Sequence, residues 1–215
     1  MSVLGASAGE LAFIYAFPFA VVFAVWLLVS LVVWAFAVSP LETDFKHDLL
    51  RKFEERRTLR SARKRLSYGY VARLLLGDNC VQAALLYRLA RFFARHRLRP
   101  AAEALHAFSK LITHLDVSPW AEIGRGVYFY HGLGTVIGKG TRIGQRAKIC
   151  QQVTTGGGPT IGDDVTLWSG AKVIGRVSIG DRAEIGANAV VLADVPADTL
   201  AVGVPARHVP RTTEA

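Results

Sequence analysis

One histidine stands where the chain interrupts an otherwise regular pattern of aliphatic residues. It is His131, in the stretch Gly-Val-Tyr-Phe-Tyr-His-Gly-Leu-Gly at 126–134, and no other histidine occurs between residues 115 and 207. A neutral imidazole accepts a proton near physiological pH, so a well-placed histidine can activate a hydroxyl as a nucleophile. The alternative is a corner residue that only hydrogen-bonds to the backbone around it. Because the histidine interrupts a repeat, we favour a general base.

The pattern that His131 interrupts has a period of six residues. Aliphatic residues, with one threonine, occupy every sixth position at Ile137, Ile143, Ile149, Thr155, Ile161, Leu167, Val173, Ile179, Ile185 and Val191. Two positions earlier in each hexad stands a small or apolar residue: Thr135, Thr141, Ala147, Val153, Pro159, Val165, Ala171, Val177, Ala183 and Ala189. A short fixed period is typical of a β-solenoid, in which each repeat buries its apolar side chains by stacking on its neighbours.

The break in the period has a defined size. Ile123 and Ile137 are fourteen residues apart, which is two residues more than two hexads. We therefore expect a small insertion that pushes one corner of a coil outward and carries His131 with it.

The other reactive side chains form no recognisable metal or redox site. Cys80 and Cys150 lack the close pairing of a zinc or redox motif, so reduced thiols are expected. His96, His106 and His114 lack the spacing of metal ligands, and we predict that each is a surface or packing residue.

The first forty residues have the character of a membrane anchor. Residues 11–39 contain no charged side chain, and a helix of this length exceeds the ~20 residues needed to cross a bilayer. A cleaved signal peptide is the less consistent alternative, because no Lys or Arg precedes the run. Basic residues follow it from Lys46 to Arg65, so the positive-inside rule places the N-terminus outside. The expected localisation is the cytoplasmic (inner) membrane, with a single span and the catalytic domain in the cytoplasm.

The positive charge of the chain is concentrated after this run. The whole chain holds 26 Lys and Arg against 17 Asp and Glu, and residues 40–115 alone hold 16 against 7. Phe45, Leu49 and Phe53 share one helical face among these cations, which favours an amphipathic helix lying on an anionic membrane surface. Nucleic acid is the less favoured partner for such a cluster.

Helical periodicity continues to about residue 115. Asp78 or Asn79 is the expected N-cap of one helix, and Pro100 is expected to open the next. The predicted organisation is an anchor at 1–40, a basic amphipathic and helical segment at 41–115, and a β-helix domain with a C-terminal tail at 116–215.

The repeat resembles the left-handed parallel β-helix of the hexapeptide-repeat acyltransferases, and within that family the chain is similar to serine acetyltransferase. The resemblance covers about residues 79–210. It rests on Val81-Gln82-Ala83 with Tyr87-Arg88, Leu115-Asp116-Val117-Ser118-Pro119, Tyr130-His131-Gly132 with Gly134, Thr154-Thr155-Gly156-Gly157, and the closing Gly203-Val204-Pro205-Ala206-Arg207. The expected fold is mainly β: a left-handed parallel β-helix, preceded by a helical segment and one transmembrane helix.

The resemblance implies a catalytic pair for acetyl transfer. His131 corresponds to the general base, and Asp116 corresponds to the carboxylate that orients the imidazole and stabilises its cation. Backbone N–H groups around Gly156 and Gly157 are candidates for stabilising the tetrahedral oxyanion.

The resemblance also implies acetyl-CoA as co-substrate, with no other cofactor. Relatives bind its pantetheine arm between neighbouring β-helices of a homotrimer, and the residues expected to line that slot are Gly157, Gly170, Ala171 and Ala187. Arg207 is expected to reach a phosphate. No metal is expected, since metalloenzymes built on this β-helix need three converging histidines and the coils contain only His131.

Two departures from serine-specific relatives bear on the acceptor. Tyr130 stands where those relatives carry an aspartate suited to a substrate ammonium. Only Gly158 separates Gly157 from Pro159, where relatives have a glycine-rich loop with a second histidine. We therefore expect an O-acetyltransferase with Tyr130 in acceptor binding and a large or membrane-associated acceptor, such as a sugar of a lipid-linked surface-glycan precursor. A membrane-tethered serine O-acetyltransferase and a non-catalytic β-helix scaffold are the alternatives.

Overall fold

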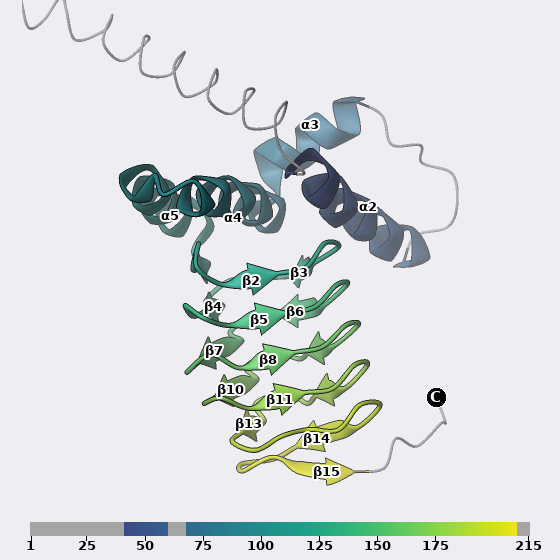
Figure 1. Ribbon diagram of the computed structural model, residues 1–215. Helices are drawn as coiled ribbons and strands as arrows, with labels where there is room; N and C mark the ends of the chain where they lie inside the picture. Colours follow the sequence, from purple (N-terminus) through teal and green to yellow (C-terminus); the bar gives the residue numbers. More distant parts are fainter. Residues whose placement is uncertain (1–40, 60–67, 210–215) are drawn as a thin grey trace, which may run out of the picture. The chain divides into compact units, whose positions relative to one another are not determined.

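The computed structural model describes residues 41–59 and 68–209, in which helices precede a stack of short strands (Figure 1). The helices are α2 (Leu41–Leu59), α3 (Tyr68–Gly77), α4 (Asn79–Arg95) and α5 (Arg99–Thr113). Asp78 is the N-cap of α4, as predicted, and its carboxylate accepts from the backbone N–H groups of Cys80 and Val81. Pro100 lies in the first turn of α5, also as predicted.

The strands form a parallel β-solenoid with three sheets, one on each side of the coil. Sheet A contains, in order, β1 (Asp116–Val117), β4 (Val136–Ile137), β7 (Thr154–Gly156), β10 (Lys172–Ile174) and β13 (Val190–Val191). Sheet B contains β2 (Glu122–Ile123), β5 (Arg142–Ile143), β8 (Thr160–Ile161) and β11 (Ser178–Ile179). Sheet C contains β3 (Tyr128–Tyr130), β6 (Lys148–Cys150), β9 (Thr166–Leu167), β12 (Glu184–Ile185), β14 (Leu200–Val202) and β15 (Arg207–Val209), of which β15 alone pairs antiparallel.

The hexad positions form the core of the solenoid, as the period of six predicted. All ten side chains in the series from Ile137 to Val191 are at most 4% exposed. The one polar member, Thr155, is buried with partners: its hydroxyl shares a hydrogen bond with the Thr141 hydroxyl at 2.9 Å and accepts from the Gly138 N–H at 3.2 Å. A threonine therefore replaces an aliphatic residue here without leaving a buried polar atom unpaired.

The first coil contains the predicted insertion. Asp116 pairs with Val136, twenty positions later, whereas Val136 pairs with Thr154 after eighteen, and the coils from there to Val190 keep that interval. The two additional residues lie in the turn between β3 and β4. The sequence prediction of an insertion around His131 is confirmed.

Helix α4 lies against the first coil and meets its outward backbone groups. The Tyr87 hydroxyl donates to the Ala121 carbonyl at 3.0 Å and accepts from the Ile123 N–H at 3.1 Å. The Arg88 guanidinium donates to the carbonyls of Ile123 and Gly124, each at 2.7 Å. These carbonyls lie at the open edge of sheet B. In later coils the equivalent carbonyls accept from the preceding coil, as the Ile143 carbonyl accepts from the Gly124 N–H, so α4 takes the place of a preceding coil here.

An ion pair buried among α2, α4 and sheet C completes this contact. Arg88 Nε and Nη2 donate to Asp48 Oδ2 and Oδ1 at 3.0 and 3.1 Å, and the Val127 N–H donates to Asp48 Oδ1 at 2.9 Å. Burial raises the pKa of the Asp48 carboxyl, and the Arg88 guanidinium opposes that shift. A second pair joins Lys52 to Asp78 at 3.1 Å.

Two expectations about the membrane need correction. The anchor predicted at residues 11–39 lies outside the described residues, and in the described ranges no helix combines the length and the apolar character needed to cross a bilayer. This finding corrects the predicted inner-membrane localisation. The apolar stripe of α2 was predicted to face lipid, but Phe45 is buried at the contact of α2 with α4 and β3, close to Cys80 and Tyr128.

Removal of Asp48 should destabilise the fold far more than removal of its neighbour Asp44. Asp48→Ala leaves the Arg88 guanidinium buried without its counter-ion, and we expect a loss of about 3–5 kcal/mol in the free energy of unfolding. Asp44 is 41% exposed and lies 3.9 Å from Arg88, so Asp44→Ala should cost less than ~1 kcal/mol. Urea unfolding followed by circular dichroism measures both. Equal losses would contradict a capping role for the buried pair.

Candidate active site

His131 occupies the outward turn between β3 and β4. Its backbone is left-handed, with φ 58°, and its ring lies 4.2 Å from the Tyr130 ring in an edge-on arrangement. Other corner residues, such as Gln152 and Asn188, share this conformation, so a left-handed backbone is a property of the coil corner and not a strain peculiar to His131. The imidazole is exposed, and no hydrogen bond to it is found among the described residues. A free ring nitrogen at an exposed corner can accept a proton from a bound hydroxyl.

The turn that carries His131 is held against the junction between the helices and the solenoid. The Gly134 N–H donates to the His114 carbonyl at 3.1 Å, and the Leu133 N–H donates back to the His131 carbonyl. Gly132 is enclosed: a Cβ there would lie 2.7 Å from Leu115 Cδ2 and 3.1 Å from Cys80 Sγ. The position of the imidazole therefore depends on the absence of a side chain at Gly132.

Asp116, predicted to orient His131, contacts a different histidine. His106 Nε2 lies 2.7 Å from Asp116 Oδ1, and Lys110 Nζ lies 4.0 Å from Asp116 Oδ2. The sequence interpretation of His106 as a surface or packing residue missed this contact. His106 and Lys110 are four residues apart on α5 and share a face, which is the signal that could have identified them as a pair directed at one carboxylate.

Asp116 nevertheless lies beside the His131 turn in the backbone. The Asp116 N–H donates to the Thr135 carbonyl at 2.9 Å, so residues 114–116 and 131–135 are adjacent rungs. Asp116 is 42% exposed, so its carboxylate is accessible beside the His106 and Lys110 contacts. The structure thus places Asp116 close to the turn that carries His131, and one of its oxygens contacts His106.

Several residues predicted to hold the donor stack under His131 at the same corner of the coil. Successive turns are joined by backbone hydrogen bonds, from Gln152 N–H to the Leu133 carbonyl, from Gly170 N–H to the Gln151 carbonyl, and from Asn188 N–H to the Ser169 carbonyl, at 2.9–3.0 Å. Gly170, Ala171 and Ala187 belong to these turns. We call this stack of turns the base corner; it comprises residues 131–135, 151–153, 169–171 and 187–189.

At Gly170 and Ala171, the base corner presents backbone groups to a ligand. Gly170 has φ +74°, and a Cβ there would collide with Asn188 Oδ1. The Ala171 methyl is fully buried in the coil interior, so only its backbone can line an outer slot. Ala187 is exposed at the same corner.

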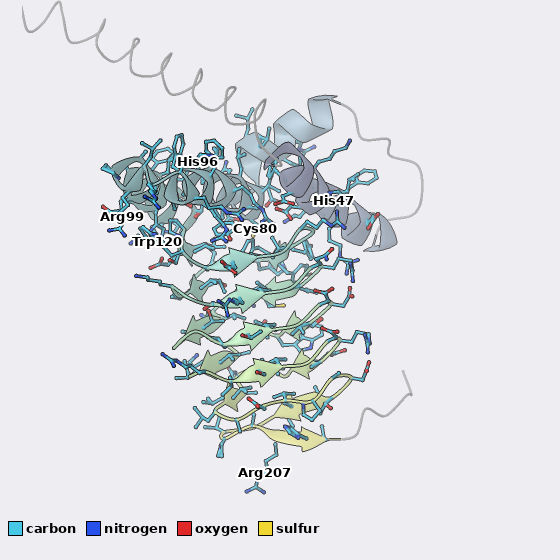
Figure 2. All side chains as sticks on the ribbon, in the orientation of Figure 1. His47, Cys80, His96, Arg99, Trp120 and Arg207 are labelled. Atoms are coloured by element: carbon cyan, nitrogen blue, oxygen red, sulfur yellow. The ribbon has the colours of Figure 1, made fainter. Side chains whose placement is uncertain are left out.

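Arg207 lies at the end of the solenoid farthest from the helices (Figure 2). It pairs with Val202 through the antiparallel contact of β15 with β14. Five inter-strand steps of about 4.8 Å separate β3 from β15, so an extended ligand along the base corner would cover roughly 24 Å between His131 and Arg207. An exposed guanidinium at the end of such a path suits a phosphate.

Gly156 and Gly157 lie at another corner, at the opposite end of the sheet A strands. Gly157 is exposed with φ +83°, and a Cβ there would lie 2.7 Å from the Gly175 Cα. No acceptor for its N–H is found among the described residues. Within one chain, strand β7 separates this donor from the base corner, so a role in oxyanion binding at His131 would require a neighbouring subunit.

The solenoid, the hexads and the stacked corner define the hexapeptide-repeat acyltransferases. The family model for the bacterial transferase hexapeptide (six repeats) matches residues 158–193. A serine acetyltransferase of Helicobacter pylori is 42% identical over 137 residues, which span 60% of this chain and 80% of that protein.

Solved structures agree with this assignment. A soybean serine acetyltransferase complexed with serine superposes with a TM-score of 0.76 and 35% identity, over 85% of this chain and 75% of that one. A serine acetyltransferase in complex with CoA superposes with a TM-score of 0.74 and 30% identity, over 84% and 74%. The chain belongs to the serine acetyltransferase family. It is an acyltransferase, which excludes the scaffold alternative, and its co-substrate is acetyl-CoA.

Filling the space beside Gly132 should impair catalysis through the position of His131. In Gly132→Ala, the new methyl must displace Leu115 or the turn, so we expect turnover to fall by 10-fold or more, since a shift of about 1 Å can lower a rate up to ~100-fold. Unfolding free energy should fall by about 1–3 kcal/mol. Gly77→Ala is the control, because a Cβ there meets nothing within 4 Å. Initial rates of thiol release measure the effect, and wild-type turnover in Gly132→Ala would contradict it.

Proposed function

We propose that the protein is a serine O-acetyltransferase, which transfers the acetyl group of acetyl-CoA to the hydroxyl of L-serine. The observation that carries the proposal is the exposed, unbonded His131 imidazole at the head of a corner that leads to Arg207. Family membership supports serine as the acceptor, as does the likeness to a relative that was solved with serine bound. The large, membrane-associated acceptor expected from the sequence has no such support, and serine takes its place.

The chemistry requires one proton acceptor and an open path to the thioester. Neutral His131 removes the hydroxyl proton while the serine oxygen attacks the thioester carbonyl. The resulting tetrahedral oxyanion collapses, the carbon–sulfur bond breaks, and the imidazolium returns its proton to the departing CoA sulfur. O-acetylserine and CoA are the products, and His131 is neutral again.

Asp116 is proposed to stabilise the imidazolium, and His106 is proposed to fix Asp116. His106 Nε2 lies 2.7 Å from Oδ1, and Lys110 Nζ lies 4.0 Å from Oδ2, so the carboxylate is held mainly through Oδ1. A carboxylate fixed in this way loses less freedom when it pairs with a cation that forms only during the reaction. His106 acts through Asp116 and is a positioning residue.

A homotrimer is proposed as the active assembly. Sheet A connects the base corner to the Gly157 corner. Val136 and Ile174 in its strands, and Leu192 directly after β13, are exposed. Packing of this side of the coil against another copy would bury these apolar side chains. It would also bring the Gly157 N–H of one chain toward His131 of the next, which a single chain does not do.

Replacement of His131 should abolish most turnover without unfolding the protein. His131→Asn retains a side chain that tolerates the left-handed corner but cannot accept the proton, so we expect the turnover number for serine to fall by about 10²- to 10⁴-fold. His96→Asn, at the exposed C-terminus of α4, should leave the rate unchanged. Thiol release from acetyl-CoA in the presence of serine measures both. A residual rate above one tenth of wild type would exclude His131 as the base.

The role of His106 can be separated from simple packing. His106→Leu should lower the turnover number by about 10- to 100-fold with little change in the KM for serine, whereas His106→Gln, whose amide can still donate to Asp116, should retain most activity. In an Asp116→Asn background, His106→Leu should have no further effect, because the two residues act as one unit. Additive losses in the double variant would show that His106 acts independently of Asp116.

A further inference from the structure

The outer face of sheet C places a lysine between two aromatic rings beside the base. Lys148 Nζ lies 5.2 Å from the centre of the Tyr130 ring and 5.3 Å from the centre of the Trp168 ring. The Tyr130 ring also contacts the His131 imidazole, at 4.2 Å between ring centres. One aromatic ring therefore touches both the ammonium and the general base.

The Lys148 side chain leans toward the base. In the strand register, Lys148 lies opposite Tyr128, but its ammonium lies over Tyr130, two residues farther along β3 and next to the His131 turn. Trp168 is held in place because its Nε1–H donates to Glu184 Oε2 at 3.1 Å. The Tyr130 and Trp168 rings thus restrict the flexible Lys148 side chain to a position near the His131 turn.

The ammonium has no carboxylate partner among the described residues. No ion pair of Lys148 occurs there. Aromatic rings attract the cation but accept no strong hydrogen bond, so its N–H donors remain for water or a ligand. An unpaired cation close to a general base is suited to an anionic group of the substrate.

The carboxylates around the site are engaged elsewhere. Asp116 is bound to His106, and Glu184 accepts from Trp168. Tyr130, directly before the base, is uncharged. Among the described residues beside His131, Lys148 is a cation without a carboxylate partner, whereas Asp116 and Glu184 already have hydrogen-bond partners.

We propose that Lys148 binds the anionic group of the hydroxyl acceptor while the hydroxyl lies at His131. The proposal rests on the proposed function in taking His131 as the base, and it deepens that function by naming the acceptor class: hydroxylated carboxylates, in which an ammonium group is dispensable. Serine belongs to this class through its carboxylate. A small hydroxy acid would place its hydroxyl at the imidazole and its carboxylate at the ammonium, with the Tyr130 ring between the two groups.

A panel of acceptors tests the class. The full chain is assayed for thiol release from acetyl-CoA with L-serine, D-glycerate, L-serinamide, D-glucuronate and D-glucose, and the acetylated products are identified by mass spectrometry. We expect kcat/KM for glycerate to lie within about 10-fold of that for serine, and serinamide to fall at least about 30-fold below serine, because it has lost the anion. Comparison of glucuronate with glycerate distinguishes a sugar acid from a small hydroxy acid, and glucose is the uncharged control for glucuronate.

Variants of Lys148 assign the effect to this residue. Lys148→Met, which retains the length and loses the charge, should raise the KM for serine and glycerate by about 10- to 100-fold and leave the KM for acetyl-CoA and the weak rate with serinamide unchanged. Lys148→Arg should retain most of the wild-type preference. Lys46→Met, at an exposed position on α2, is the matched control and should leave all values unchanged.

The outcomes separate this proposal from the proposed function. Turnover of glycerate or glucuronate without serine would remove serine as the acceptor and support Lys148 as the anion site, provided that Lys148→Met abolishes it. Turnover of serine with an unchanged KM in Lys148→Met would overturn the Lys148 proposal and leave the proposed function intact. An increased KM for acetyl-CoA alone would assign Lys148 to the donor and overturn the proposal, as would equal rates with serine and serinamide. Absence of turnover with every acceptor in the panel would overturn both the proposed function and the Lys148 proposal.

Discussion

A parallel β-solenoid must end, and its first coil exposes backbone groups that have no preceding coil to pair with. In this protein the side chains of α4 meet them, through the Tyr87 hydroxyl and the Arg88 guanidinium. The guanidinium is buried, so it requires Asp48 of α2 as its counter-ion, and Asp48 in turn accepts from the backbone of the first coil. This closed set of contacts locks the helices onto the coil. The same junction encloses Gly132 and thereby sets the position of His131, the proposed general base. The contacts that hold the helices on the first coil therefore also set the geometry of the proposed site.

Much of the solenoid was predictable because its information is local and repeated. Every sixth residue buries its side chain, and this rule held for Thr155 as well as for the aliphatic positions, since Thr141 satisfies its hydroxyl. The insertion at His131 was also predictable, because a departure of two residues is visible only against a strict period. The stacking of Gly170 and Ala187 under His131 follows from the same arithmetic of eighteen residues per coil.

What could not be predicted depends on contacts between distant segments. The apolar stripe of α2 has the same sequence pattern whether it faces lipid or protein. The burial of Phe45 and the ion pair of Asp48 with Arg88, forty residues away, show that this side of α2 faces protein. Asp116 was expected to pair with His131, yet His106 from α5 holds it, because the crossing of α5 over β1 is a property of the tertiary fold. The cluster of a lysine and two aromatic rings beside His131 could not be predicted for a similar reason. Tyr130, Lys148 and Trp168 lie about eighteen to twenty residues apart and meet only after the coil is wound.

The uniform rise of the coils has a consequence for the evolution of such a protein. The separation between the histidine at one end and the arginine at the other can change only in whole steps, each of eighteen residues and about 4.8 Å. Loss or duplication of one coil would leave the packing of the interior intact, since each coil contacts only its neighbours, but would move the two ends out of register with a donor of constant length. If the donor extends from His131 to Arg207, as proposed, its length sets the number of coils, which the stability of the solenoid alone does not.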